Sequence, residues 1–417
     1  MRTCTVRFAA VLAASSFACA AACADEAAPA FSLSGFGTLG VIHSDNDKAD
    51  YLLDAFHPDG PGHARRWSAD ADSRVGLQLS TQFAPRLSAV VQVIAEQRYD
   101  GSHRPSVEWA NVKLQLTPEL SLRAGRVVLP IFMVTDSRKV GYANVWVRPP
   151  VEMYSLVPVT SNDGVDASYR MTLGEATNTL QVTLGRSDSK FPGSAGLGSG
   201  TAKARKLVAL VDTYEQGFFT ARATYGQARL TIDEYTPLTD ALRQFGPQGA
   251  ALAERYGVMG KRVGFVGLGA TYDPGSWFVT GEWADFDTRS LIGKKNAWYV
   301  SGGYRIGKAT PYATYARMKA DSNTYDPGLN LAGLPAPLAA GGAQLNAVLN
   351  AQLSAIPVQS TFSLGVRWDF MSNAALKLQY DRVSAGSTSH GTFGNLQPDF
   401  PVGARVQLFS ATVDFLF

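Results

Sequence analysis

Residues 406–417, VQLFSATVDFLF, alternate between apolar and polar side chains up to a final phenylalanine. Successive side chains of a β-strand point to opposite faces, so this period of two predicts a strand. A single strand of this kind fits a soluble β-sandwich as well as a membrane barrel, so the rest of the chain has to decide. The apolar face of the strand would consist of Phe409, Ala411, Val413, Phe415 and Phe417.

The same alternation recurs along the chain in segments of about ten residues, which is typical of outer-membrane barrels. The pattern predicts about sixteen strands, and such barrels have an even number of strands in this range. We expect these strands near residues 31–43, 72–83, 86–98, 106–116, 119–126, 163–172, 177–186, 204–215, 217–230, 261–272, 276–286, 295–306, 310–319, 360–370, 375–383 and 403–417.

The connections between the expected strands alternate in length. Every second connection is a tight turn, such as Ala-Pro-Arg at 84–86 and Asp-Pro-Gly at 273–275. Most of the others are long, including 127–162 and 320–359. Short turns at one end and long loops at the other distinguish a transmembrane barrel from a soluble sandwich. The sequence therefore predicts an all-β protein, a transmembrane antiparallel β-barrel.

The N-terminal residues have the features of an export signal. Residues 1–24 combine Arg2 and Arg7 with an apolar, Ala-rich segment and a small-x-small site at 22–24. We expect them to be a cleaved signal peptide, and residues 25–417 to form the barrel. The alternative of a lipoprotein acylated at Cys19 or Cys23 is less favoured, because neither cysteine has a leucine three positions before it.

Composition narrows the functional classes. The net charge of +3 gives no support to a nucleic-acid partner, and no metal site or cofactor is expected. The five histidines fall in or beside predicted long loops, so no nucleophile–base pair of an enzyme is expected on the barrel wall. His57 and His63 form at most a weak metal pattern, for which a solvated loop is the simpler interpretation.

The polar parity of the strands carries many charges. Residues 362–370, FSLGVRWDF, place aromatic and aliphatic side chains on one face and Arg367 and Asp369 on the other. In a large barrel the apolar face contacts lipid and the charged face lines an aqueous lumen. The predicted pore-wall residues are Arg74, Glu96, Arg98, Lys113, Arg123, Arg367 and Asp369.

The opening strand, FSLSGFGTLG at 31–40, and the terminal phenylalanine resemble those of the trimeric Gram-negative general porins. This resemblance covers the architecture of the mature chain and implies an outer-membrane location, a homotrimer, and contact with the lipid bilayer and lipopolysaccharide. It also implies that Phe415 and Phe417 belong to a signal for the barrel-assembly machinery. The implied function is a water-filled channel for the passive diffusion of small hydrophilic solutes and ions.

The third long connection, VVLPIFMVTDSRKVGYANVWVRPPVEMYSLVPVTSNDG at 127–164, is too apolar for a solvated loop. In the porins that the sequence resembles, the third loop folds into the barrel and narrows it. We therefore expect residues 127–160 to form a constriction loop; the alternative is that they pack on the wall or cap a neighbouring subunit. The charges expected to meet a solute there are Asp136, Arg138, Lys139, Arg148 and Glu152.

Ion preference and two competing functions stay open at this point. Basic residues outnumber acidic ones on the polar parity, which weakly favours anions, but the loop carries mixed charge and lacks the short acidic motif of enterobacterial porins. The alternatives are a substrate-selective channel for anionic solutes and a non-conducting structural or adhesin barrel. Two further loop segments, 237–257 and 338–356, have helical periodicity.

Overall fold

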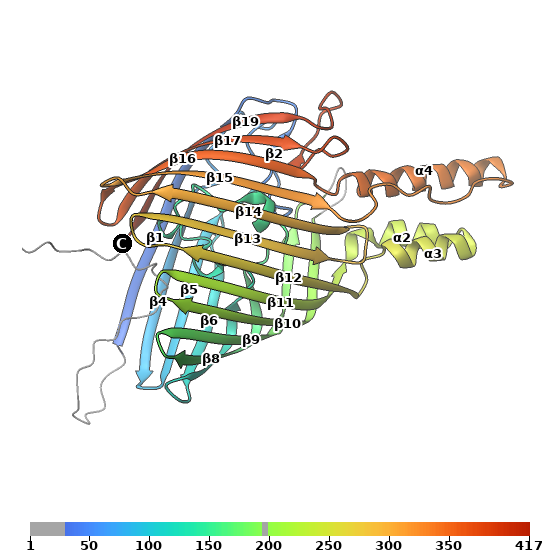
Figure 1. The fold of residues 1–417 in the computed structure, drawn as a ribbon. Helices are drawn as coiled ribbons and strands as arrows, with labels where there is room; N and C mark the ends of the chain where they lie inside the picture. Colours follow the sequence, from blue (N-terminus) through green and yellow to red (C-terminus); the bar gives the residue numbers. More distant parts are fainter. Residues whose placement is uncertain (1–29, 194–198) are drawn as a thin grey trace, which may run out of the picture.

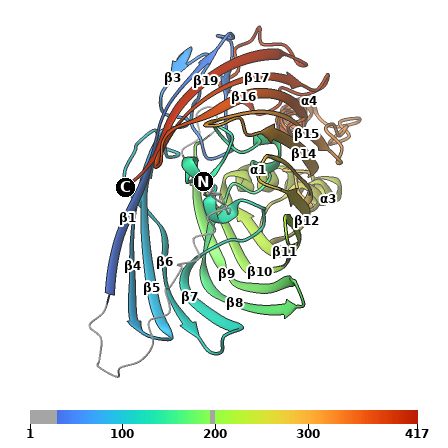
Figure 2. The ribbon, with the colours of Figure 1, turned by 60° about the vertical axis from the view of Figure 1, so that its left-hand side comes forward.

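The computed structural model describes residues 30–193 and 199–417, and in them sixteen long antiparallel strands close into a ring (Figure 1, and turned by 60° in Figure 2). Each long strand pairs with the next along the chain, and β1 pairs with β19 to complete the ring. The strands are β1 (Ala30–Ser44), β4 (Arg74–Ala84), β5 (Leu87–Glu96), β6 (Ser106–Gln115), β7 (Leu120–Val128), β8 (Ser161–Leu173), β9 (Ala176–Phe191), β10 (Gly200–Gln216), β11 (Phe219–Ile232), β12 (Lys261–Tyr272), β13 (Trp277–Asp287), β14 (Lys294–Tyr304), β15 (Ala309–Ala320), β16 (Gln359–Met371), β17 (Ala374–Ala385) and β19 (Arg405–Leu416).

The predicted antiparallel barrel of about sixteen strands is confirmed, and so is the alternation of its connections. Short turns join β4 to β5 and every second pair after it, so one end of the barrel is trimmed. The predicted signal peptide, residues 1–24, lies outside the described residues.

The opposite end carries the long loops and most of the short elements. The helices α2, α3 and α4 lie at this end, where the two predicted helical segments are found, and project away from the barrel (Figure 1). None of the helices in the described ranges is long and apolar enough to cross a bilayer. The short elements are β2 (Asp50–Tyr51), β3 (Trp67–Ser68), β18 (Phe393–Gly394), the 3-10 helices η1 (Thr135–Ser137), η2 (Gly141–Ala143) and η3 (Asp233–Tyr235), and the α-helices α1 (Val151–Tyr154), α2 (Thr236–Arg243), α3 (Gly246–Tyr256) and α4 (Ala336–Ser354).

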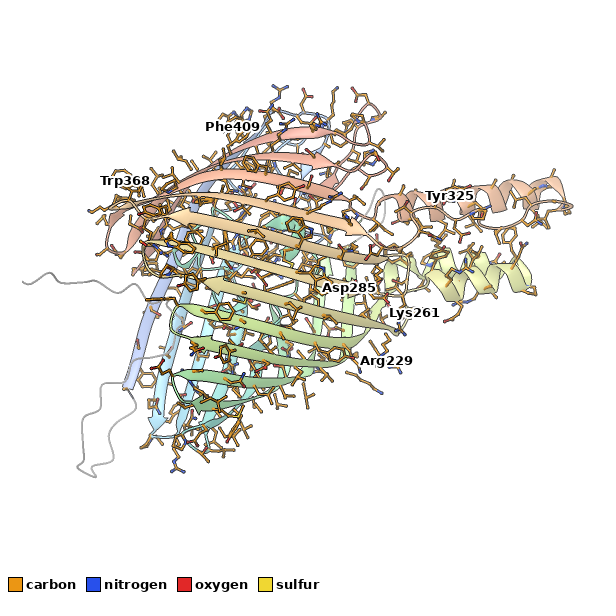
Figure 3. The ribbon with its side chains drawn as sticks, in the orientation of Figure 1. Arg229, Lys261, Asp285, Tyr325, Trp368 and Phe409 are labelled. Atoms are coloured by element: carbon orange, nitrogen blue, oxygen red, sulfur yellow. The ribbon has the colours of Figure 1, made fainter. Side chains whose placement is uncertain are left out.

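The two parities of the strands differ as the sequence predicts. Large apolar side chains point outward and are exposed, as Trp368 and Phe409 show (Figure 3). Leu268 is likewise exposed. Their neighbours on the inward parity are polar or small, as Arg367 and Ser410 show. An apolar belt outside and a polar lining inside are the arrangement of a barrel whose solvent is lipid on one side and water on the other.

The seam between β1 and β19 explains the glycines of the opening strand. Gly35 and Phe417 exchange two backbone hydrogen bonds, with N···O distances of 2.7 and 3.0 Å. A Cβ atom at Gly35 would lie 2.3 Å from the Phe417 ring, and one at Gly37 would lie 2.4 Å from the Phe415 ring. The two glycines therefore leave the space that the terminal aromatic rings occupy.

Candidate pore site

The β7–β8 loop, residues 129–160, contacts strands on opposite sides of the ring. The backbone N–H of Met133 donates to Glu282 of β13 at 2.8 Å. Lys139 donates to Glu96 of β5 at 2.6 Å and to Glu108 of β6 at 2.9 Å. In the ring of sixteen strands β5 and β13 are eight strands apart, which is half of the circumference.

The apolar side chains of this loop pack against an apolar part of the inner wall. Phe132 and Tyr154 form the centre of a cluster with Phe265 of β12 and Tyr299 of β14. Burying a large side chain of this kind stabilises the packed state by about 1.5–3 kcal/mol. Small inward residues, such as Ala284, make room for the loop. This patch explains how so apolar a segment avoids water.

Arg148 fixes the middle of the loop to the wall. Its guanidinium donates to both oxygens of Asp72, at 2.9 and 2.6 Å, and to Asp381 of β17 at 2.9 Å. A fourth bond reaches Ser410 of β19 at 2.6 Å. Arg148 is only 7% exposed, so these charges are compensated in a desolvated environment. We call Asp72, Arg148 and Asp381 the arginine clamp.

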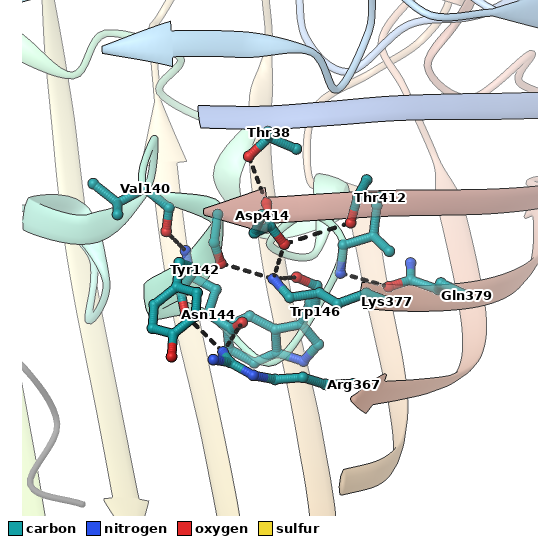
Figure 4. A network of polar contacts seen from close by, with 12 residues as sticks. Thr38, Val140, Tyr142, Asn144, Trp146, Arg367, Lys377, Gln379, Thr412 and Asp414 are labelled. Atoms are coloured by element: carbon teal, nitrogen blue, oxygen red, sulfur yellow. Dashed lines mark hydrogen bonds and ion pairs between the residues drawn. The ribbon is translucent and has the colours of Figure 1, made fainter. Parts of the chain in front are cut away.

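Lys377 of β17 holds the backbone of the same loop (Figure 4). Its ammonium donates to the carbonyl oxygens of Gly141 and Trp146, at 2.7 and 2.8 Å, and lies 2.9 Å from Asp414. The side chain is fully buried. Nearby, Arg367 of β16 donates to the carbonyl oxygens of Tyr142 and Asn144 (Figure 4). Two wall cations therefore bind four loop carbonyls.

Two buried carboxylates complete the attachment. Glu152, in α1, accepts hydrogen bonds from Gln359, at 2.7 Å, and from Thr361 of β16. Glu282 of β13 accepts from the hydroxyls of Tyr154, at 2.5 Å, and Tyr299, at 2.8 Å. Each carboxylate thus joins the loop to the wall through neutral donors, which satisfy its oxygens without a second charge.

The five predicted loop charges therefore differ in their surroundings. Asp136 in η1 is exposed. Arg138 lies over the Tyr154 ring, 5.3 Å from its centroid, and donates to two carbonyls of the same loop. Lys139 is partly buried between two carboxylates, whereas Arg148 and Glu152 are buried. Of the five, Asp136, Arg138 and Lys139 are accessible to solvent, and Arg148 and Glu152 are not.

The predicted wall residues fall into three groups. Arg74 and Glu96 form a 3.8 Å ion pair beside Lys139, and Arg98 bonds the Arg104 carbonyl in the loop after β5. Arg367 and Asp369 pair with each other below the loop. Lys113 and Arg123 lie on β6 and β7, and Arg123 pairs with Asp166 of β8.

The inner face of β6–β8 forms what we call the open wall: Lys113, Arg123, Asp166 and Arg170. Lys113 and Arg170 are exposed, while Arg123 pairs with Asp166 at 2.8 Å. Among the described residues, no side chain of these four forms a hydrogen bond with the β7–β8 loop. The open wall contains three basic and one acidic side chain, a net of two positive charges.

The sequence-based site prediction does not include four of the residues that hold the loop: Asp72, Asp381, Lys377 and Asp414. Apart from Asp72, which precedes β4, each lies on the inward parity of its strand. Parity alone marks such residues as facing the lumen, but it does not show which of them the loop will cover.

The long β1–β4 connection reaches the same site. Asp54 accepts a 2.9 Å hydrogen bond from His57. Burial works to raise the pKa of Asp54, but the charge and hydrogen bond of His57, together with the charge of Arg138, lower it to about 2. Burial likewise opposes protonation of His57, yet Asp54 and Glu96 raise its pKa. The pair therefore lies within reach of the charges around Lys139.

Known proteins share this architecture. Residues 9–388 match the family model described as Gram-negative porin. The outer membrane channel DcaP of Acinetobacter baumannii has the same fold, with a TM-score of 0.56 at 13% identity over 94% of this chain and 99% of that one. An anion-selective porin from Comamonas acidovorans gives a TM-score of 0.53 at 13% identity over 93% and 100% of the two chains.

No curated protein matches the sequence. The family match covers most of the chain, and the strand ring, the apolar outer face and the polar lining agree with it. The chain belongs to the Gram-negative porin family.

Proposed function

We propose that the β7–β8 loop narrows the channel and that the open wall makes the remaining passage favour small anions. The channel itself follows from the family: the protein is an outer-membrane porin for the passive diffusion of small hydrophilic solutes. The proposal adds which residues shape the passage and which side chains a solute meets there.

The observation that carries the proposal is the position of the contacts at Met133 and Lys139. They lie six residues apart in sequence but bond strands that are eight apart in the ring. Six extended residues span at most about 20 Å, so this part of the loop would run across the lumen and not along its rim. Segment 133–139 would then leave a path beside the open wall.

The bonds of Arg148 and Glu152 support a positioning role for these two residues. Both are buried and paired with wall groups, so neither offers a charge to a passing solute. Asp136, Arg138 and Lys139 remain the loop charges that would face the passage, together with the wall cations Lys113 and Arg123.

The charge of the open wall supports the preference for anions. Lys113 and Arg170 are exposed and have no carboxylate partner among the described residues. Unpaired charges in a narrow aqueous path with low-dielectric walls attract counter-ions. One of the solved structures with this fold is described as anion-selective, which agrees with the proposal, although at 13% identity it indicates the fold alone.

The proposal extends to the partners. We infer a homotrimer, contact with lipopolysaccharide in the outer leaflet, and recognition of Phe415 and Phe417 by the barrel-assembly machinery. The first two follow from the resemblance to general porins, and the third is supported by the fit of both rings over Gly35 and Gly37. The proposal assigns the protein no catalytic reaction.

Single-channel recording in asymmetric KCl tests the function directly. The purified protein should form ohmic pores with a reversal potential on the anion side. Replacing Arg138 and Lys139 together by Glu should move the reversal potential toward cations, and shortening segment 133–139 should raise conductance. The same charge reversal at the exposed Arg243 of α2 serves as the control and should leave both values unchanged.

A protein that inserts but never conducts would favour the structural or adhesin alternative. If both loop variants leave the conductance and the reversal potential unchanged, the loop does not line the passage.

A further inference from the structure

One buried cation inside the barrel has no counter-charge. Lys295 is the second residue of β14, at the long-loop end, and is 8% exposed. Among the described residues it forms no hydrogen bond and no ion pair; its ammonium nitrogen lies 5.9 Å from the centroid of the Phe286 ring. Two other buried cations of the inner face, Arg148 and Lys377, each contact a carboxylate, at 2.6 and 2.9 Å.

The parity of β14 places the Lys295 side chain on the inner face. Ala297 and Tyr299 of the same strand belong to the apolar cluster inside the barrel, and Lys295 shares their parity. Its Nζ atom is not one of the fully enclosed polar atoms that lack a partner in the described chain. The stem of the side chain is therefore buried while its ammonium group reaches water, as is common for lysine on apolar surfaces.

The strand neighbours of Lys295 are apolar. Phe286 of β13 lies directly opposite it on one side, and Ala320 of β15 lies directly opposite it on the other. Phe286 packs against the apolar cluster that the β7–β8 loop covers, and Ala320 packs against a second cluster that includes residues of α2, α3 and α4. Both side chains are only partly buried. We call Phe286, Lys295 and Ala320 the entry site.

An unpaired charge in such surroundings destabilises the fold. Burying an ionised group costs free energy unless a partner compensates it, and an apolar side chain of similar size would avoid this cost. In membrane proteins, an ionisable side chain that is kept within a spanning segment despite the cost commonly marks a solute path or a binding site. The position of Lys295 therefore points to a role in binding.

The missing partner indicates the chemistry of a ligand. The ammonium group of Lys295 can donate charge-assisted hydrogen bonds to a carboxylate. The Phe286 ring beside it offers an apolar contact, and sites for small molecules combine a mostly apolar lining with a few placed polar groups. A small inorganic anion would use the charge alone, and a neutral aromatic molecule would use the ring alone.

We propose that the entry site binds carboxylates that carry an apolar body, such as aromatic monocarboxylates, as they enter the lumen from the long-loop side. The bound carboxylate would supply the counter-charge that Lys295 lacks. The inference rests on the proposed function, in that solutes pass through the lumen, and deepens it by naming a class of solute.

The test measures the binding of benzoate to the folded protein in detergent by isothermal titration calorimetry. The variant is Lys295→Met, which keeps an apolar stem and removes the charge. Its matched control is Lys319→Met, which removes an exposed cation of the opposite parity on the neighbouring strand β15. Acetate and benzamide are the matched probes, because acetate lacks the aromatic body and benzamide lacks the charge.

Benzoate should bind the unchanged protein and Lys319→Met with equal affinity, and Lys295→Met at least tenfold more weakly. Acetate and benzamide should each bind the unchanged protein at least tenfold more weakly than benzoate does. The heat-modifiable band of Lys295→Met should be lost at a temperature no lower than that of the unchanged protein, because an unpaired buried charge has been removed. Weaker binding could then not be ascribed to misfolding.

A cysteine variant tests whether the ammonium position faces water. Residues 25–417 contain no cysteine, so Lys295→Cys gives this part of the chain a single thiol. Modification with 2-aminoethyl methanethiosulfonate builds a positively charged side chain close to lysine in length and should restore benzoate binding. Methyl methanethiosulfonate, which adds no charge, should not restore it.

Equal benzoate affinities for the unchanged protein and Lys295→Met would overturn the inference, as would a complete lack of benzoate binding. Acetate that binds as tightly as benzoate, or a thiol that neither reagent reaches, would overturn it as well. None of these measurements needs conduction. An absent anion preference in asymmetric KCl would instead contradict the proposed function and would not alter the binding result.

Discussion

The two sides of the barrel interior carry charges at the same strand parity but use them differently. On the covered wall, formed by the inward side chains of β11–β17 and β19 that contact the β7–β8 loop, charged groups bond the loop or one another, as Lys377 and Asp381 show. On the open wall, Lys113 and Arg170 are exposed. The comparison teaches that a lumenal charge acts on solutes or on the loop according to what lies over it, not according to its position in a strand.

The largest effect is expected when the arginine clamp is broken. Arg148→Met leaves Asp72 and Asp381 buried without a counter-charge, and removing one side of a buried ion pair costs about 3–5 kcal/mol. The variant should unfold at lower temperature or denaturant concentration, and surviving pores should show larger and noisier conductance because the loop is released.

The control for the clamp is Asp72→Asn with Arg148→Met and Asp381→Asn, which removes all three charges together. It should recover most of the lost stability. A triple variant as unstable as Arg148→Met would mean that the shape of the guanidinium, and not the charge balance, holds the loop.

A smaller loss of stability is expected at Lys377, because its substitution leaves a single buried carboxylate, that of Asp414, without a counter-charge. Lys377→Met removes the donor to Gly141 and Trp146 and leaves Asp414 buried, at a cost of about 3 kcal/mol. Thermal unfolding followed by the gel shift would measure it. Adding Asp414→Asn should restore part of the loss; if it lowers stability further, the two residues act independently.

On the open wall the effect should fall on selectivity and not on stability. Lys113→Glu with Arg170→Glu reverses two exposed charges, so the reversal potential in asymmetric KCl should move toward cations. The unfolding temperature should change little, because both side chains are exposed and neither forms an ion pair with another residue that the structure describes. An unchanged reversal potential would place the ion path elsewhere in the lumen.

The smallest effect concerns pH and the Asp54–His57 pair. The raised pKa of His57 contributes stability that is present at low pH and lost as the pH rises through that pKa. The pKa of Asp54, lowered to about 2, contributes stability above its ordinary 3.8 that is lost as the pH falls toward 2. The stability difference between the unchanged protein and His57→Gln should therefore shrink on the alkaline side.

The matched substitution for this pH series is His63→Gln, in the same connection but exposed. If the stability difference between the unchanged protein and His57→Gln stays constant across neutral pH, the Asp54–His57 pair does not contribute as assigned.

The barrel was predictable because period-two alternation and loop length are local properties that each strand displays by itself. The residues that hold the β7–β8 loop were not predictable as a set. Asp72 and Asp381 are far apart in the sequence and meet only through Arg148. The apolar character of the loop indicated burial, but Ala284 and Ala297, which make room for it, look like ordinary small strand residues until the packing is seen.

The seam between β1 and β19 has a consequence for how the ring forms. Thr38 and Asp414, which bond across it, are separated by 376 positions, whereas other long strands pair with a sequence neighbour. Closing so long a loop lowers conformational entropy before any stabilising contact offsets the loss, and contacts of high sequence separation form slowly. Ring closure should therefore be the late step of folding, and Gly35 and Gly37 would set its rate by admitting the Phe417 and Phe415 rings in only one register.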